Sequence, residues 1–151
     1  MRTLGRLSVD PDSIERGDAG APLEIVVPYT ESSLAQAVLQ RAAVLTAGLE
    51  VRIQLIAVHT IPYPADMGYP AAAHAHLVEQ LIDLAGSCRL AVDPQVVLAR
   101  YWDEGFRYAI KPNSTVLIGT RDRLWRTQEE RLAQVLAREG HQVALIHIEK
   151  G

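Results

Sequence analysis

Three arginines close to the start of a predicted helix are the residues of this chain best suited to hold an anion. Arg121, Arg123 and Arg126 follow an apolar run that ends at Gly119, and a helix is predicted to begin at Thr127. Guanidinium groups form paired hydrogen bonds with carboxylate and phosphate oxygens, and the N–H groups at a helix N-terminus also favour anions. A strand that ends in glycine and leads into such a helix is a common nucleotide or anion site in parallel α/β proteins.

The same residues also admit a purely structural explanation. The acidic neighbours Asp122, Glu129 and Glu130 can partly neutralise the arginines in a solvated loop, and we favour this interpretation over an anion site. Thr127 and Glu130 have the spacing of a capping box, which satisfies unpaired N–H groups at a helix start. The two roles are compatible, because a cap leaves other N–H groups available for a ligand.

Further candidate ligand contacts lie at the ends of two predicted strands. Tyr29 and Thr30 follow the first strand, and His59 ends the second. A histidine there could contact a ligand or respond to pH, but we favour a local hydrogen-bonding role because no acidic or serine partner is evident. No residue is assigned a catalytic or metal-binding role. The candidate binding residues are Tyr29, Thr30, His59, Gly119, Thr120, Arg121, Arg126 and Thr127.

The apolar pattern predicts the elements that must position these residues. Short runs rich in β-branched residues predict strands, and apolar residues at helical spacing predict the helices between them. Ser32 or Ser33 is expected to cap the first helix. Proline and glycine at residues 62–70 predict a loop. The predicted strands are residues 23–28, 51–59, 93–99, 115–118 and 143–148, and the predicted helices begin near residues 32, 71, 103 and 127.

The regular alternation of strand and helix predicts an α/β fold of Rossmann-like type. Each right-handed crossover places a helix on one face of the sheet, so we expect a five-stranded parallel sheet covered by about four helices. For this sheet we predict the strand order 3-2-1-4-5. In that order the winding reverses between the first and fourth strands, and a ligand crevice lies outside their carboxyl ends. Residues 1–21 should form a flexible extension, and residues 22–151 a single domain.

Charge and cysteine content limit the class of protein. The chain has 151 residues, a formal net charge of −3 and one cysteine, Cys88. This charge gives no support to a broad nucleic-acid or anionic-membrane footprint. A lone cysteine excludes an internal disulfide and suits a reducing compartment. Since no signal peptide or membrane-spanning run is evident, the sequence predicts a cytoplasmic protein with no nucleic-acid partner and no membrane insertion.

The order and spacing of the apolar segments resemble those of the universal stress protein family. The segments that carry the resemblance are residues 25–28, 55–59, 116–121 and 143–146. They begin with the first predicted strand and end with the last, so the resemblance covers nearly all of the predicted domain. It implies the same α/β fold that the alternation of elements predicts.

The sequence departs from this family at both places that hold ATP in its nucleotide-binding members. Those members end the first strand with aspartate, whereas Thr30 or its neighbour offers an uncharged hydroxyl here. Gly119 matches the first glycine of the family's phosphate loop, but Asp122 replaces the second, and Arg126 precedes Thr127 in a shortened loop. Backbone N–H groups close on phosphate where no Cβ intervenes. The resemblance therefore implies the branch without the nucleotide motif, whose members are regulatory dimers.

These observations lead to a hypothesis of function. We expect a non-catalytic regulatory or interaction module that needs no cofactor and acts on an unidentified protein partner. We also expect a homodimer through residues 143–148, because this apolar strand would otherwise be an uncovered edge, and universal stress proteins dimerise through their final strand. Two alternatives stay open: an ATP- or AMP-binding protein with an altered arginine-rich phosphate site, and a regulatory domain associated with a membrane transporter.

Overall fold

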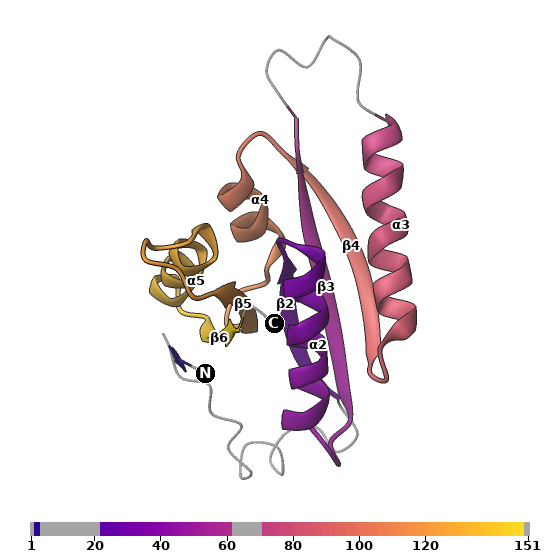
Figure 1. Cartoon of the computed structure of the whole chain (residues 1–151), viewed down its shortest axis with the longest axis vertical. Helices are drawn as coiled ribbons and strands as arrows, with labels where there is room; N and C mark the ends of the chain where they lie inside the picture. The colour runs from indigo at the N-terminus through magenta and orange to yellow at the C-terminus, as the bar shows by residue number, and fades with distance from the viewer. Residues whose placement is uncertain (1, 4–21, 62–70, 150–151) are drawn as a thin grey trace.

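The elements alternate along the chain as the sequence predicts (Figure 1). A computed structural model describes residues 2–3, 22–61 and 71–149, so the predicted loop at 62–70 and most of the predicted extension lie outside the described residues. The strands are β1 (Arg2–Thr3), β2 (Leu23–Tyr29), β3 (Val51–Thr60), β4 (Ala91–Ala99), β5 (Thr115–Arg121) and β6 (Gln142–Ile148). The helices are α2 (Ser32–Leu45), α3 (Ala71–Ser87), α4 (Trp102–Ala109) and α5 (Gln128–Arg138).

The five strands from β2 to β6 form an all-parallel sheet, and their order confirms the prediction. Neighbouring strands run β4-β3-β2-β5-β6, which is 3-2-1-4-5 when these five are numbered along the chain. β2 pairs with β3 from Leu23 to Tyr29, and β5 pairs with β6 from Thr115 to Arg121. The winding therefore reverses between β2 and β5, which is the property that creates a ligand crevice in a doubly wound sheet.

Helices cover both faces of this sheet. On β6, Ala144 and Ile146 belong to the core cluster beneath α2 and α3, whereas Val143 and Leu145 belong to the cluster beneath α4 and α5. α2 and α3 therefore lie on one face, and α4 and α5 lie on the other (Figure 1). Strand side chains alternate between the two faces of a sheet. Because helices of the same chain cover both faces, every side chain from Val143 to Ile146 is buried, and the apolar sequence of β6 needs no second copy to explain it.

A short sixth strand covers part of the outer edge of the sheet. β1 pairs antiparallel with β6, with Arg2 opposite Leu145 and Thr3 opposite Ala144. This is the edge at which the sequence predicts that a second copy binds. The chain's own N-terminal residues therefore occupy two positions that a partner strand would otherwise use.

The helix ends agree with one local prediction and correct another. Thr127 is the N-cap of α5, and its hydroxyl oxygen accepts a hydrogen bond from the Glu130 N–H at 3.1 Å. The N-cap of α2 is Glu31, whose side chain makes no capping bond, so the predicted cap at Ser32 or Ser33 is wrong. The Ser33 hydroxyl instead donates to the Glu31 carboxylate at 2.6 Å. The helix begins at Ser32, so both serines lie within its first turn, after the N-cap position.

Candidate functional site

The sheet separates where its winding reverses. In the described part of the chain, β2 and β5 pair at Ile25 with Thr115 and at Val26 with Val116, and their carboxyl halves are not paired with each other. A cavity of about 320 Å³ lies beyond this separation, between the start of α2 and the start of α5. We call it the switch-point cavity. Its position is the one at which doubly wound sheets bind ligands.

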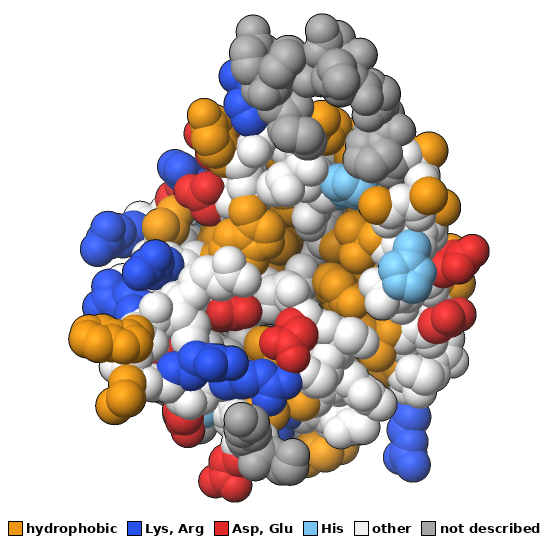
Figure 2. All heavy atoms as spheres, turned by 45° about the horizontal axis from the view of Figure 1, so that its top comes forward, with side chains coloured by type: hydrophobic (Ala, Val, Ile, Leu, Met, Phe, Trp, Pro, Cys, Tyr) orange, Lys and Arg blue, Asp and Glu red, His pale blue; other side chains and the backbone are white. Residues whose placement is uncertain are grey.

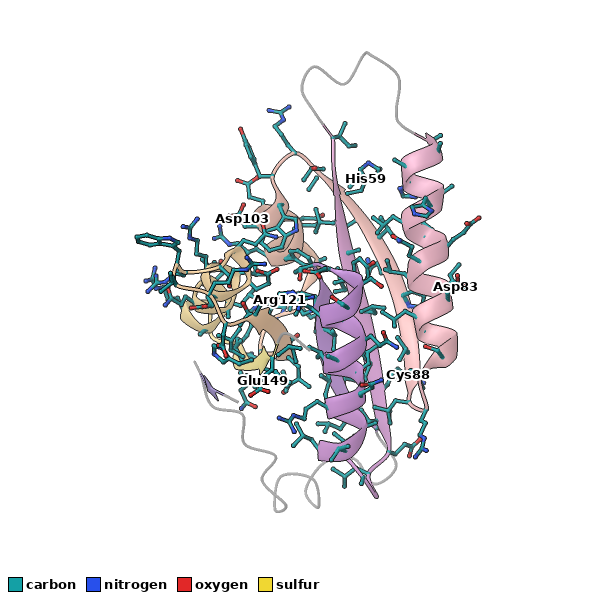
Figure 3. The ribbon with its side chains drawn as sticks, viewed as in Figure 1. His59, Asp83, Cys88, Asp103, Arg121 and Glu149 are labelled. Carbon is teal, nitrogen blue, oxygen red and sulfur yellow. The ribbon has the colours of Figure 1, made fainter. Side chains whose placement is uncertain are left out.

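Charged side chains of both signs line the switch-point cavity. They come from the turn after β2, the end of β5 and the first turn of α5, and Figure 3 places Arg121 beside α2 and α5. Two of the lining residues are arginines and two are glutamates, so their formal charges cancel. The lining residues are Glu31, Leu34, Arg121, Arg123, Thr127, Gln128 and Glu129.

Arg121 is held by the opposite wall of the cavity. Its Nη2 donates to Glu31 Oε1 at 2.7 Å and to the Ser33 hydroxyl at 2.5 Å. The hydrogen bonds from Arg121 and Ser33 lower the pKa of Glu31, and the bond to Glu31 raises the pKa of Arg121. The Arg121 side chain is 22% exposed and that of Glu31 is 49% exposed, so water reaches both. An incoming anion must displace the Glu31 carboxylate to reach this guanidinium group.

A pair of threonine hydroxyls joins the end of β5 to the start of α5. Thr120 is fully buried, and its Oγ1 lies 2.6 Å from Thr127 Oγ1. The same Thr127 oxygen accepts the capping bond from the Glu130 N–H. A hydroxyl group has one proton and two acceptor positions, so most of the hydrogen-bonding capacity of Thr127 is used within the protein.

Gly119 lies at a close contact between α2 and β5. A Cβ atom at this position would lie 2.6 Å from Val38 Cγ2 and 3.4 Å from the Leu34 carbonyl oxygen. A real Cβ does not approach another carbon atom that closely, so glycine is required for this contact between helix and sheet. The glycine that matches a phosphate-loop position in the sequence therefore serves packing in the structure.

Three other predicted binding residues do not line the cavity. Tyr29 is buried in the core cluster on the α2 and α3 face, and Thr30 is half-buried at the strand end. Arg126 is exposed, and its Nη1 donates to Gln134 Oε1 at 2.9 Å, which directs the side chain along α5. Tyr29 therefore serves the core, and Arg126 faces solvent outside the crevice.

His59 belongs to a different part of the fold. Its ring stacks on that of His74 in α3, with centroids 5.7 Å apart and planes 29° apart. His59 lies at the carboxyl end of β3, and Figure 3 shows it away from Arg121. Of the predicted binding residues, Arg121 and Thr127 thus line the switch-point cavity, and Thr120 contacts Thr127 behind it.

Glu31 lines the cavity and binds Arg121, but the sequence did not identify it as a site residue. The sequence predicts an uncharged hydroxyl at the end of the first strand, but Glu31 follows Thr30 directly and supplies a carboxylate. An acidic residue within two positions of that strand end is a signal that the sequence does contain. Glu129 is a second correction, because it is buried against the cavity rather than lying in a solvated loop.

Comparison with family models finds no match for this chain, and comparison with curated proteins finds none either. Across residues 2–3, 22–61 and 71–149, no three side chains from His, Cys, Asp and Glu are grouped as a metal ion requires. The helices of the same segments include none that combines the length and apolarity needed to cross a bilayer. The site and the sequence are therefore the only indications of function.

Proposed function

We propose that this chain is a non-catalytic regulatory or interaction module of universal stress protein type, in which the usual ATP loop is lost. The observation that carries the proposal is the 2.7 Å bond between Arg121 and Glu31. The arginine best placed to hold a phosphate is already neutralised by the protein itself. The doubly wound sheet is compatible with this proposal, but the same fold supports many functions.

The charges around the cavity support the loss of ordinary ATP binding. A nucleotide phosphate would meet the carboxylates of Glu31 and Glu129, both of which line the cavity. Like charges at short range disfavour binding unless one of them is protonated or moves away. The glycine-rich backbone cradle is also missing, because Asp122 replaces its second glycine and Gly119 lies against Val38 of α2. Together these features favour a site that is closed to polyphosphates.

The proposed module acts as a homodimer through the outer edge of β6 and regulates an unidentified protein partner in the cytoplasm. The apolar side chains from Val143 to Ile146 are buried within one chain. A second copy would therefore bind through the backbone of the edge, as paired strands do. Such pairing must share the edge with β1 or replace it at Ala144 and Leu145.

An adenine-nucleotide-binding protein with an altered phosphate site is the second candidate. The position of the switch-point cavity favours it, as do Arg121, Arg123 and Thr127 in the lining. In this case Arg121 would exchange the Glu31 carboxylate for a phosphate oxygen, and the N–H groups of the first turn of α5 would contribute further donors. ATP or AMP would then be the ligand.

A thermal-unfolding screen with ATP, ADP, AMP and phosphate distinguishes the two candidates. A ligand that binds the native state stabilises it by about 2.7 kcal/mol at a hundredfold excess over its Kd. The proposal predicts that no nucleotide shifts the unfolding temperature and that the purified protein will release no nucleotide when it is denatured. A selective shift that is lost in Arg121→Ala, but kept when the exposed Arg89 is changed to Ala, would overturn the proposal in favour of the second candidate.

Glu31→Gln makes the same screen more informative. If the Glu31 carboxylate is what closes the cavity, this variant should gain a phosphate-dependent shift that the natural sequence lacks. The gain should disappear when Arg121→Ala is added. No gain in Glu31→Gln would mean that the cavity is not an anion site even when its arginine is released.

A further inference from the structure

The loop between β5 and α5 carries two adjacent apolar side chains that pack on almost nothing. Leu124 is 99% exposed and Trp125 is 84% exposed. Single exposed apolar residues are common on protein surfaces. Two large apolar side chains that follow each other in the chain and both project into water concentrate apolar surface at one loop, which is typical of an interaction site. We call residues 122–126 the tip loop.

Several basic side chains in and after the tip loop are exposed to solvent. Four arginines are exposed in the tip loop and along α5, namely Arg123, Arg126, Arg131 and Arg138. Gln134 holds Arg126 along the same helix through the 2.9 Å bond. Figure 2 shows Lys and Arg side chains gathered along the left flank, which is the side on which Figure 1 shows α5. Arg123 and Arg126 therefore flank the apolar pair directly, and Arg131 and Arg138 continue the basic surface along α5, although the whole chain carries a net charge of −3.

Two of the acidic side chains of this region, Glu129 and Glu130, are turned inward, whereas Asp122 and Glu149 are exposed. Asp122 pairs with His147, whose Nδ1 lies 2.5 Å from Asp122 Oδ1. Glu129 is buried against the switch-point cavity, and Glu130 is half-buried in the same turn. Glu149 is exposed and shares a smaller cavity with Arg123. Within the tip loop, two exposed arginines therefore stand beside one exposed carboxylate, Asp122, so the loop carries a net positive charge.

We propose that the tip loop docks this protein on the surface of an anionic lipid bilayer. Tryptophan is favoured at the boundary between headgroups and acyl chains, where Leu124 would also leave water. The flanking arginines would contact lipid phosphates, as basic residues do at anionic membrane surfaces. The contact is peripheral, and it involves the loop side chains rather than a membrane-spanning helix.

The shape of the tip loop favours a bilayer over other anionic partners. A projecting pair of side chains enters a bilayer without a preformed pocket, whereas a protein partner needs a matching cavity. A nucleic acid could stack on Trp125 but offers an aliphatic Leu124 no comparable contact. The docking goes beyond the proposed function, and its test uses lipid rather than nucleotide, so the two proposals can fail separately.

Co-sedimentation of the full chain with lipid vesicles tests the proposal. We expect binding to vesicles that contain phosphatidylglycerol, no binding to pure phosphatidylcholine, and a loss of binding as salt is added. Leu124→Ser combined with Trp125→Ser should abolish binding. Arg123→Gln combined with Arg126→Gln should weaken it by roughly tenfold to thirtyfold. All four changes are at exposed positions, and thermal unfolding checks that the variants remain folded.

Matched controls separate the tip loop from general surface effects. Tyr108→Ser removes another exposed aromatic side chain, and Arg52→Gln removes an exposed arginine on β3. Neither change should alter binding. The chain has two tryptophans, so Trp102→Phe leaves Trp125 as the reporter, and its emission should move to shorter wavelength on anionic vesicles.

Three results would overturn the proposal. The first is no binding to anionic vesicles at low salt. The second is an equal loss of binding in the control variants and the tip variants. The third is binding to a polyanion such as heparin or DNA that depends on Trp125 while anionic vesicles are not bound, which would identify a nucleic-acid or other polyanion surface instead.

Discussion

Arg121 Nη2 and Glu31 Oε1 lie 2.7 Å apart, although 90 positions separate the two residues in the chain. They meet because β2 and β5 are neighbours whose pairing stops after Val26 and Val116. The ends of the two strands then diverge, and the turn before α2 faces the end of β5 across the switch-point cavity. The protein's own carboxylate thus stands where comparable sheets place an anionic ligand.

The Glu31–Arg121 pair predicts a pH-dependent contribution to stability. Arg121 and Ser33 lower the pKa of Glu31 in the folded protein below its ordinary value of 4.5. A carboxyl group with a lowered folded pKa stabilises the protein above its unfolded pKa, and the stabilisation is lost as pH falls through the folded pKa. The natural sequence should therefore be more stable than Glu31→Gln at neutral pH, by a small amount because both partners are partly exposed.

Urea unfolding of both proteins across a pH series measures this contribution. The difference between them should shrink as the pH falls below 4.5 and should vanish once Glu31 is protonated in the folded state. A difference that stays constant over the whole series would show that Glu31 acts through packing rather than through its charge.

Gly119→Ala should destabilise the protein because the added methyl group meets Val38. Overpacking of this kind costs about 1–3 kcal/mol. In a Val38→Ala background the cost of Gly119→Ala should be much smaller, since the obstructing Cγ2 atom is gone. Gly86→Ala is the matched control, because no other group lies within 4 Å of the added carbon there. Equal costs of Gly119→Ala in both backgrounds, measured by denaturant unfolding, would contradict this account.

Thr127→Ala should destabilise the protein by about 1 kcal/mol or more, because it removes the N-cap of α5. The variant also removes the hydrogen bond between Thr127 Oγ1 and Thr120 Oγ1, and the buried Thr120 hydroxyl then loses this partner. Thr127→Ser keeps the oxygen and should retain most of the stability. Thermal unfolding of the two variants compares them directly, and equal losses would argue that the methyl group of Thr127 matters more than its hydroxyl.

Removal of residues 1–21 should strengthen the proposed homodimer. The truncation frees the β6 edge at Ala144 and Leu145, where β1 now pairs, and an uncovered edge is the preferred place for a second strand to add. Sedimentation velocity over a range of concentrations measures the change. Thr3→Pro in the full chain should act in the same direction, because proline has no N–H group to donate within the pairing.

The dimer prediction can fail in two distinguishable ways. Weaker association after truncation would mean that residues 1–21 contribute to the interface. A monomer in both forms would mean that the edge of β6 is not an interface between copies.

The sequence by itself determined the class of fold, because the signals for helices and strands are local. The helix predicted to begin near residue 71 begins at Ala71 in the structure, and the Thr127 cap occurs as its spacing predicts. The parallel sheet follows from the alternation of elements and the handedness of their crossovers, which allow the order 3-2-1-4-5 among others. Each of these inferences uses residues that are close together in the chain.

Only the tertiary structure decided what the candidate site contains. Its main contacts join residues from different elements. Arg121 at the end of β5 binds Glu31 and Ser33 at the start of α2. Gly119 of β5 lies against Val38 of α2. The pairing of β1 with β6 is also a contact between distant parts of the chain. Hydrophobic periodicity reports which side of an element is buried. It does not report which distant side chain lies opposite, because that depends on where two strands stop pairing and how closely a helix crosses them.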